Sequence, residues 1–472
     1  MSILEAFLAT AARRGAHPAI IDGRGRSVSF SALALWSDEL AEGWRRKGIR
    51  RGDRVLIATR IGLPLYAGLA ALWRLGAVAV FPEPALGLKG LRHAIGATRP
   101  RAVFSGGWLA GLRFALPELW GRGPLLLAFD RRRPTRTPTI ALPDDHPALI
   151  SFTSGSTGLP KAIERTHGFL AAQHAAVSPL LVAGHEHERD LVAFPVFVLV
   201  NLALGTTSVL PSWNVTRHDK VEAAALAAVV RERGVTRLLV PPSVCEALAE
   251  GGPPPGISAI FTGGGPVFPD VMERLAAASP GCRIVAVYGS TEAEPIAHIG
   301  ADEIASADWA AMREGAGLLA GRPVPDVALR LIDGEIVVSG AHVNKTYMDP
   351  SRNAGSKIAL DGEIWHRTGD AGRLDEEGRL WLLGRVDARV GALHPFGVEA
   401  AARFWPGVRR AALAGIGGRP VLAIEGDGAE AGTWERNARR LGIERVVALA
   451  AIPLDRRHRS KVDYPALRAA LA

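Results

Sequence analysis

The sequence predicts an α/β protein with a large N-terminal domain of layered α/β subdomains, a small β-rich subdomain and a small C-terminal α+β domain. Three observations predict this class. In the first half, apolar β-rich runs alternate with amphipathic helical runs, a pattern typical of parallel strands covered by helices. From residue 327 the runs become short and resemble antiparallel strands, and the composition changes again after residue 387. We therefore expect one domain at 1–387 and another at 388–472.

Strands and helices alternate through the first hundred residues. Ser29 is a favourable N-cap and Gly48 a favourable stop for the helix between them. The predicted strands are 17–22, 54–59, 77–81 and 101–104, and the predicted helices are 29–47, 63–75 and 88–98. A proline-rich, basic stretch at 131–143 then predicts an exposed connector.

The remaining elements follow the same two patterns. The expected helices are 168–178, 219–233 and 269–278, and the expected strands are 148–152, 236–240, 257–262 and 283–288. Strands of the β-rich subdomain are expected at 328–332, 335–339, 363–368, 372–375 and 379–383. Strands of the C-terminal domain are expected at 411–416, 421–425 and 446–449.

Composition and charge narrow the class of protein. The net charge is +9, but the densest basic clusters, 131–133 and 455–459, are too short to follow a nucleic-acid backbone. An anionic small substrate or an arginine-rich composition explains the charge as well, and we expect no nucleic-acid partner. Two cysteines do not make a disulfide framework and fit a reducing compartment.

Segment 191–211 is uncharged over a length that could span a membrane. Pro195, Gly205 and Pro211 interrupt it, so we expect a buried strand–turn–helix segment instead. The N-terminus has no basic region before an apolar core and is therefore unlike a signal peptide. We expect a cytoplasmic protein without a transmembrane span.

The stretch SFTSGSTGLPKAIER, residues 151–165, is the strongest local signal for a ligand. Its glycines allow main-chain N–H groups to turn inward together, its hydroxyls add donors, and its lysine adds a mobile positive charge, so the loop is suited to phosphate. The spacing differs from a P-loop NTPase, and a plain Gly/Ser turn is the alternative. The residues expected to bind phosphate are Thr153, Ser154, Gly155, Ser156, Thr157, Gly158 and Lys161.

Three further loops follow predicted strands and could bind the same ligand as the stretch 151–165. The reason is that the carboxyl ends of the strands lie along one edge of an α/β sheet. Tyr288 offers a stacking face for a base. Thr291 can donate to phosphate, Glu292 can hold a Mg²⁺ that bridges phosphates, and Asp370 can accept ribose hydroxyls. The three loops are Gly263-Gly264-Gly265, Tyr288-Gly289-Ser290-Thr291-Glu292 and Thr368-Gly369-Asp370.

These motifs, in this order and over nearly the whole chain, resemble the adenylate-forming superfamily of acyl-CoA synthetases, firefly luciferases and nonribosomal-peptide adenylation domains. TSGSTGLPK resembles the family's phosphate loop, with Ala162 where glycine is usual. YGSTE is similar to the motif that stacks on adenine and meets phosphate and Mg²⁺. HRTGD and GRVD resemble the ribose-binding and hinge motifs, and DRRHRSKVDY resembles the motif that supplies a catalytic lysine.

The resemblance implies an enzyme that uses ATP and Mg²⁺ to convert a small-molecule carboxylic acid into an acyl-AMP, with release of pyrophosphate. It implies catalytic roles for Lys461, Thr291 and Glu292, with Glu292 as the metal ligand. Asp387 falls at the hinge about which a small, mobile C-terminal lid would rotate. The implied nucleotide-binding residues beyond the phosphate loop are Gly263, Gly264, Gly265, Tyr288, Gly289, Ser290, Asp370 and Arg385.

Two departures from the family pattern concern the site for the carboxylic acid and the reaction that follows formation of the acyl-AMP. The family's histidine is missing from FPVFVLVN, residues 194–201. We expect this stretch to line an acyl pocket through Phe194, Phe197 and Asn201, and core packing is nearly as good an explanation. After the hinge, the segment 388–401 is altered and shortened, which leaves a role for CoA open.

RTHGFLAAQH, FPVFVLVNLALGTTSVLP and RHRSKVDY look most like a subgroup that includes bacterial olefin-pathway β-lactone synthetases, in which a β-hydroxyl displaces AMP. Two alternatives stay open. One is a fatty or aryl acyl-CoA or acyl-carrier-protein ligase, with a carrier protein or pathway enzymes as partners. The other is a non-catalytic nucleotide-binding relative acting as a partner subunit, which the retention of Glu292 and Lys461 argues against.

Overall fold

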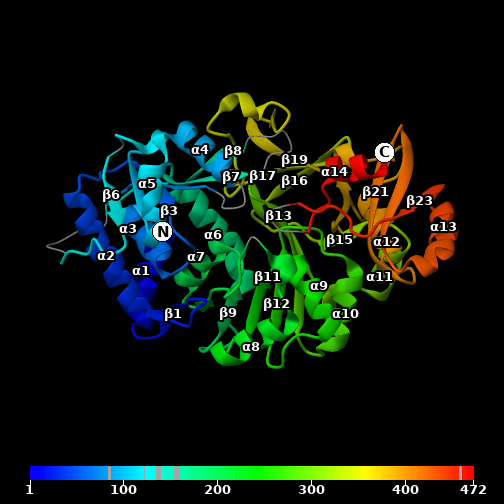
Figure 1. Ribbon diagram of the computed structural model, residues 1–472, viewed down its shortest axis with the longest axis horizontal. Coiled ribbons are helices and arrows are strands. Elements are labelled where there is room, and N and C mark those ends of the chain that lie inside the picture. The colour runs from blue at the N-terminus through cyan, green and yellow to red at the C-terminus, as the bar shows by residue number, and fades with distance from the viewer. Residues whose placement is uncertain (83–86, 122, 134–139, 154–159, 216, 456–459) are drawn as a thin grey trace. The chain divides into compact units, whose positions relative to one another are not determined.

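The computed structural model describes residues 1–82, 87–121, 123–133, 140–153, 160–215, 217–455 and 460–472. It divides into two compact units. The first comprises 1–214, 229–236 and 341–357, and the second comprises 215–228, 237–340 and 358–472. Figure 1 shows the elements coloured along the chain. Most of the predicted phosphate loop, 154–159, lies outside the described residues.

The strands of the first unit confirm the predicted parallel α/β pattern. One sheet has the order β6-β5-β3-β4-β7-β8, in which β8 alone is antiparallel to its neighbour. In the other sheet, β9, β10 and β1 are parallel and β2 is antiparallel to β1. The bounds are β1 (Pro18–Ile21), β2 (Ser27–Ser29), β3 (Arg54–Ala58), β4 (Val78–Phe81), β5 (Ala102–Ser105), β6 (Leu125–Leu127), β7 (Pro147–Thr153), β8 (Lys161–Thr166), β9 (Arg189–Val192) and β10 (Thr207–Val209).

Local sequence accounts for where the helices of this unit begin and end. Ser29 accepts a hydrogen bond from the Ala32 N–H at 3.2 Å, which confirms the predicted N-cap of α2. Gly205 ends α7 at φ +93°, a backbone conformation that favours glycine. The bounds are α1 (Ile3–Arg14), α2 (Phe30–Arg46), α3 (Leu63–Arg74), α4 (Gly87–Thr98), α5 (Leu112–Ala115), α6 (His167–Leu181) and α7 (Pro195–Leu204).

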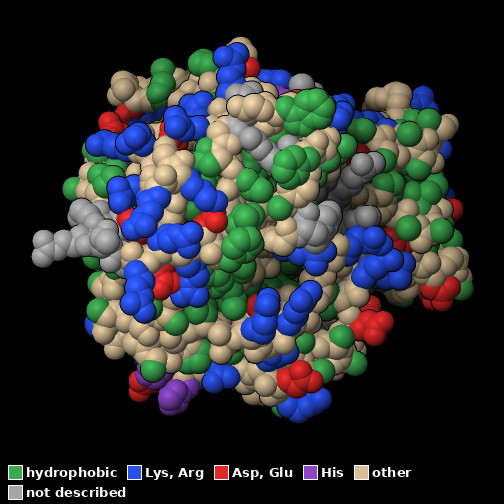
Figure 2. Space-filling view, turned by 60° about the vertical axis from the view of Figure 1, so that its left-hand side comes forward, with side chains coloured by type: hydrophobic (Ala, Val, Ile, Leu, Met, Phe, Trp, Pro, Cys, Tyr) green, Lys and Arg blue, Asp and Glu red, His purple; other side chains and the backbone are tan. Residues whose placement is uncertain are grey.

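The apolar segment 191–211 forms the end of β9, the helix α7 and the strand β10, as expected for a buried strand–turn–helix segment. Across the described residues, no helix combines the length and apolar character that a membrane crossing requires. Figure 2 shows Lys and Arg side chains in several separate groups on the drawn face rather than in one continuous patch.

The second unit contains parallel strands and, in its β-rich part, a sheet of antiparallel strands. Strands β11, β12 and β13 are parallel, and β14 returns antiparallel to β13. The β-rich part has the order β15-β20-β19-β17-β16, with β18 paired to β19. The bounds are β11 (Arg237–Val240), β12 (Ala259–Gly263), β13 (Arg283–Ser290), β14 (Ala293–Gly300), β15 (Leu318–Gly321), β16 (Ala328–Ile332), β17 (Glu335–Ser339), β18 (Lys357–Leu360), β19 (Glu363–Leu374) and β20 (Leu380–Arg385).

Helices of the central part of the chain are α8 (Ala223–Arg233), α9 (Pro242–Gly251), α10 (Pro269–Ala278) and α11 (Ser306–Arg313).

Two predicted loops turn out to belong to strands. The sequence predicted separate strands at 363–368 and 372–375, whereas β19 runs from Glu363 to Leu374 and includes Asp370. Similarly, β13 continues through Ser290. Both strands carry a register shift at these positions, so an irregularity in pairing takes the place of a strand end.

The C-terminal residues form a small sheet with its own apolar cores on both faces. Strands β21 (Val408–Ile416) and β22 (Arg419–Gly426) are antiparallel, and β23 (Arg445–Ala448) is parallel to β22. One core surrounds the fully buried Trp434, and the other includes Leu467 and Leu471. The helices are α12 (Pro395–Ala402), α13 (Ala431–Arg440) and α14 (Tyr464–Leu471). The domain boundary at 387/388 stays a prediction.

A buried carboxyl group lies inside this C-terminal part. Glu399 on α12 is 1% exposed and accepts hydrogen bonds from the Leu413 N–H at 3.1 Å and the Tyr464 hydroxyl at 3.2 Å. Burial raises the pKa of Glu399 from 4.5 to about 7. The folded state therefore binds more protons than the unfolded state between these two pKa values, and stability falls as pH rises through that window.

We predict that Glu399→Gln removes this pH dependence. The neutral amide keeps an acceptor for Leu413 and carries no charge. The unfolding free energy of the variant relative to the wild type should therefore be higher at pH 8 than at pH 5, by up to about 3 kcal/mol. Denaturant unfolding at both pH values measures this. Glu435→Gln on the exposed side of α13 is the control, and an equal pH response from both variants would contradict the prediction.

Candidate functional site

The Asp370 carboxylate is held by two side chains that come from different sheets. Its Oδ2 accepts a hydrogen bond from the Tyr288 hydroxyl at 2.9 Å, and its Oδ1 pairs with Arg385 Nη1 at 3.1 Å. Burial, and after it the Asp370 charge, raises the pKa of Tyr288 well above its ordinary value, so the phenol stays protonated and donates. A carboxylate has about four lone-pair directions, so Asp370 retains acceptor capacity for a ligand.

Arg385 lies at the end of β20 and remains charged. Burial lowers the pKa of its guanidinium, but the Asp370 and Asp387 carboxylates outweigh this effect and raise the pKa overall. Asp387, the predicted hinge residue, lies 3.9 Å from Arg385 Nε. Gly369 has φ +72°, and a Cβ there would lie 2.4 Å from the Arg385 guanidinium. A side chain at this position would strain the backbone and displace the Arg385 guanidinium.

Glu335 fixes the backbone that presents Asp370. Its Oε1 accepts the Gly369 N–H at 2.9 Å, and its Oε2 accepts from Arg367 Nε at 2.8 Å. Its side chain is buried, so this carboxylate acts through the strand and not through direct access to a ligand. Sequence reasoning missed this residue. Glu335 begins β17, which pairs with β19, so its contact with HRTGD depends on a partner strand that local sequence does not identify.

Ser290 ends β13, two residues after Tyr288, and carries a buried hydroxyl. The Ser290 hydroxyl oxygen is buried and has no hydrogen-bond partner in the described part of the chain. Buried polar atoms are ordinarily paired, so an unpaired hydroxyl here fits a ligand such as a phosphate. Thr291 and Glu292 occupy the turn between β13 and β14.

A Mg²⁺ at this turn would be held jointly by the protein and by the phosphates of a bound substrate. Among the described residues there is no cluster of three or more His, Cys, Asp or Glu that could hold a metal. Mg²⁺ is commonly bound by one or two carboxylates together with substrate phosphates. Glu292 with phosphate oxygens is a donor set of that kind.

The glycine turn after β12 lies against Ser460, the residue that precedes Lys461. A Cβ on Gly265 would lie 2.6 Å from Ser460 Cβ, and a Cβ on Gly263 would lie 2.5 Å from the Val287 carbonyl oxygen. Asp455 holds the backbone of Ser460 and Lys461, because its Oδ1 accepts their N–H groups at 3.1 and 3.0 Å. The Lys461 side chain is exposed.

A buried ion cluster fastens α12 and β21 to the helices α9 and α10. The Arg403 side chain is 4% exposed and pairs with Asp270 at 2.6 Å and with Glu246 at 3.2 Å. Arg410 on β21 also pairs with Glu246. The Arg403 guanidinium lies 4.6 Å from the centroid of the Phe268 ring. Sequence reasoning missed this cluster, since no local pattern relates these residues.

In the first unit, Lys161 begins β8, which is antiparallel to β7. It pairs in register with Thr153, which is buried. The Lys161 ammonium donates to the Ser356 hydroxyl at 2.9 Å and lies 4.6 Å from the centroid of the Tyr347 ring. The other predicted phosphate-binding residues lie outside the described residues: Ser154, Gly155, Ser156, Thr157 and Gly158.

The predicted acyl-pocket residues have different surroundings. The rings of Phe194 and Phe197 are half-buried and meet edge to face, with centroids 5.8 Å apart. Asn201 is fully buried, and its amide donates to Asp190 Oδ2 at 3.0 Å and to Ser208 Oγ at 3.1 Å. Its contacts are those of a core polar network, and its role in an acyl pocket stays a prediction.

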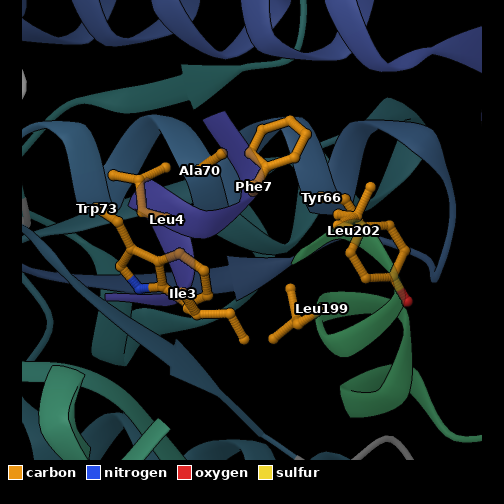
Figure 3. A pocket seen from close by; sticks show the side chains of 8 residues that line it. All are labelled: Ile3, Leu4, Phe7, Tyr66, Ala70, Trp73, Leu199 and Leu202. Atoms are coloured by element: carbon orange, nitrogen blue, oxygen red, sulfur yellow. The ribbon is translucent and has the colours of Figure 1, made fainter. Parts of the chain in front are cut away.

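A small apolar cavity lies on another side of α7, between α1 and α3 (Figure 3). Its volume is about 10 Å³, the least that holds one water molecule. We regard it as a packing gap that is too small for an acyl chain. Its lining residues are Ile3, Leu4, Phe7, Tyr66, Ala70, Trp73, Leu199 and Leu202.

The predicted site residues therefore fall into two sets. The structure brings together Tyr288, Asp370 and Arg385, and it brings the Lys461 segment to the glycine turn at Gly265. Thr153, Lys161, Phe194, Phe197 and Asn201 belong to the first unit.

Comparison with known proteins gives a consistent assignment. The family model described as "AMP-binding enzyme" matches residues 7–348. An olefin beta-lactone synthetase from Stenotrophomonas maltophilia is 30% identical, covering 92% of this chain and 90% of that protein. Another from Xanthomonas campestris pv. campestris is 31% identical, covering 92% and 89%.

Solved structures share the fold at lower identity. Amide bond synthetase McbA from Marinactinospora thermotolerans matches with a TM-score of 0.82 and 22% identity over 100% of both chains. O-succinylbenzoate coenzyme A synthetase from Bacillus subtilis, in complex with ATP and magnesium ion, matches with a TM-score of 0.78 and 21% identity over 98% of this chain and 99% of that one.

We predict that Tyr288→Phe destabilises the second unit by about 1.5–3 kcal/mol, because the variant removes a hydrogen bond to a charged group and keeps the ring. Denaturant unfolding measures the loss. Tyr66→Phe in the first unit is the comparison, since its hydroxyl donates to a neutral carbonyl oxygen at 3.3 Å and should be worth about 1 kcal/mol or less. A loss at Tyr288 no larger than that at Tyr66 would contradict the prediction.

Proposed function

The chain belongs to the AMP-binding enzyme family of adenylate-forming enzymes that activate carboxylic acids, and on that premise we propose that its acid is a fatty or β-hydroxy fatty acid. We further propose that the acyl-AMP closes to a β-lactone. The observation that carries this proposal is the likeness, over nine-tenths of the chain, to two olefin beta-lactone synthetases. The protein would work in the cytoplasm on a small-molecule substrate.

In the proposed first step, a carboxylate oxygen attacks the α-phosphorus of ATP in line, and the bond to the bridging oxygen of pyrophosphate breaks. Negative charge is then spread over the phosphoryl oxygens, so positioned cations and donors are the main contribution of the protein. We assign Lys461 and Thr291 to the α-phosphate. Mg²⁺, bound through Glu292 and phosphate oxygens, would neutralise charge on the phosphates.

The remaining assignments follow the contacts of each residue. Asp370, oriented by Tyr288 and Arg385, would accept from the ribose hydroxyls. Ser290 is supported as a phosphate ligand by its unpaired buried hydroxyl. The glycines at 263–265 would let adenine lie against backbone, with Tyr288 as its stacking partner. Rotation about Asp387 would move the Lys461 segment between steps.

In the proposed second step, the β-hydroxyl oxygen attacks the acyl carbon and its proton passes to solvent. The bond between the acyl carbon and the phosphate oxygen breaks, and AMP departs as the four-membered ring closes. An acyl-CoA ligase is the second candidate. It is favoured by the likeness to a feruloyl-CoA synthase from Amycolatopsis sp., 29% identical over 86% of this chain. A non-catalytic relative is the remaining alternative.

We predict that the protein catalyses ATP–pyrophosphate exchange with at least one acid in a panel of fatty, β-hydroxy fatty and aryl acids. Lys461→Ala should lower the exchange rate by roughly 100-fold or more, because it removes a positioned cation from the developing charge. Arg468→Ala on α14 removes an exposed cation from the same part of the chain and should leave the rate unchanged. If no acid supports exchange although ATP binds, the enzyme assignment of this chain fails.

We predict that a β-hydroxy acid gives a β-lactone, AMP and pyrophosphate without any added thiol. Mass spectrometry of reactions with and without CoA measures the products. The 3-deoxy analogue of the same acid, which lacks the attacking hydroxyl, should stop at the acyl-AMP. Detection of an acyl thioester that forms only when CoA is present would assign CoA ligation, in place of lactone formation, as the second step.

A further inference from the structure

Tyr464 joins the start of the last helix to a buried carboxyl group on α12. It begins α14, and its hydroxyl donates to Glu399 Oε1 at 3.2 Å. Glu399 is 1% exposed, and the same oxygen accepts the Leu413 N–H of the edge strand β21 at 3.1 Å. An edge strand presents N–H groups that no neighbouring strand pairs, and Glu399 accepts one of them as well as the Tyr464 hydroxyl.

This contact crosses the edge of the small C-terminal sheet. On one face of the sheet, Val398 of α12 packs with Leu413 in a common apolar core. On the other face, Tyr464 packs against the core that contains Leu467 of α14. The bond from Tyr464 to Glu399 therefore ties the helix on one face to the helix on the other at β21.

Lys461 lies three residues before Tyr464, and hydrogen bonds hold the backbone around it. The Lys461 N–H donates to Asp455 Oδ1 at 3.0 Å, and the Asp455 N–H donates to the Lys461 carbonyl oxygen at 2.8 Å. The Asp463 N–H donates to the Pro453 carbonyl oxygen at 2.9 Å. Because the backbone from 461 to 464 is held in this way, a displacement of Tyr464 would be passed on to the residue that carries the lysine side chain.

Charged groups at the predicted hinge act on the same tyrosine. Burial, and after it the Glu399 and Asp387 charges, raises the pKa of Tyr464, and Arg385 opposes them by a smaller amount. The phenol therefore stays protonated and donates. Arg385 itself pairs with Asp370 in the candidate site. Tyr464 thus lies within electrostatic reach of the residues that connect the hinge to that site.

We propose that Glu399 and Tyr464 are positioning residues that hold the Lys461 segment, residues 460–464, where its lysine can act. This inference rests on the proposed function, because Lys461 is the cation assigned there to the α-phosphate. The pair acts through the backbone, so loss of its hydrogen bond displaces the lysine and removes no group that is assigned to ATP. A displaced cation stabilises the transition state less, so the rate constant falls while ATP affinity is kept.

The first measurement is ATP–pyrophosphate exchange by the full chain with an acid that supports it. Tyr464→Phe removes the hydroxyl and keeps the ring, and should lower kcat by roughly tenfold and leave the KM for ATP within about twofold. Glu399→Gln keeps an amide oxygen as acceptor and should retain kcat within about threefold. Tyr66→Phe is the matched control, since its hydroxyl donates to the Pro195 carbonyl oxygen in the first unit, and should leave both constants unchanged.

The second measurement does not depend on catalysis. Amide hydrogen–deuterium exchange, followed by mass spectrometry of peptides that contain residues 460–464, reports how firmly the Lys461 segment is held. Tyr464→Phe should speed the exchange of these amides by roughly tenfold, because the segment loses a buried hydrogen bond. Glu399→Gln and Tyr66→Phe should leave the amide exchange rates within about twofold of the wild type.

Several outcomes would overturn the inference. They are an unchanged kcat in Tyr464→Phe, a change confined to the KM for ATP, an equal loss of kcat in Tyr66→Phe, or unchanged amide exchange in the Lys461 segment. Circular dichroism shows whether each variant folds, and Glu399→Met, which removes the acceptor in place of the donor, replaces Tyr464→Phe if the latter does not. If the wild type supports no pyrophosphate exchange with any acid while Tyr464→Phe still loosens the segment, the proposed function fails and the anchoring of the segment stands.

Discussion

The Asp370 carboxylate is the group on which the arrangement of the candidate site depends. One of its oxygens accepts from Tyr288 on β13, and the other pairs with Arg385 at the end of β20, so one charge joins two sheets. Glu335 fixes the backbone immediately before it. Because an interaction with a charged group is costly to leave unmade, these residues hold one another in position and preorganise the acceptor for a ligand.

A second charged cluster sets the position of the C-terminal part within the second unit. Arg403 is buried between Asp270 and Glu246, and a buried ion pair of this kind adds little net stability over apolar packing. Its contribution is geometric, because a misplaced α12 would leave buried charges unpaired. Ser460, the residue before Lys461, meets Gly265. The cluster and the glycine turn together define where the proposed catalytic lysine enters.

Lys161 and Arg385 are cations that are held by different kinds of group. Lys161 rests on a tyrosine ring and a serine, whereas Arg385 is paired with the carboxylate that it helps to orient. This difference separates the two roles. A cation without a carboxylate partner remains available for an anion, and a cation within an ion pair positions its partner.

The sequence by itself determined the α/β class, the caps of helices such as α2, and the motifs that carry the family assignment, because these depend on neighbouring residues or on fixed spacings. It could not place Ser290 and Asp370 inside strands, since a register shift depends on the partner strand. Glu335, Tyr347 and Arg403 were equally hidden, because each acts on residues distant in the chain. Only the tertiary structure decides such contacts: the free energy of a buried charge or ring depends on what packs around it, and local sequence does not encode that surrounding.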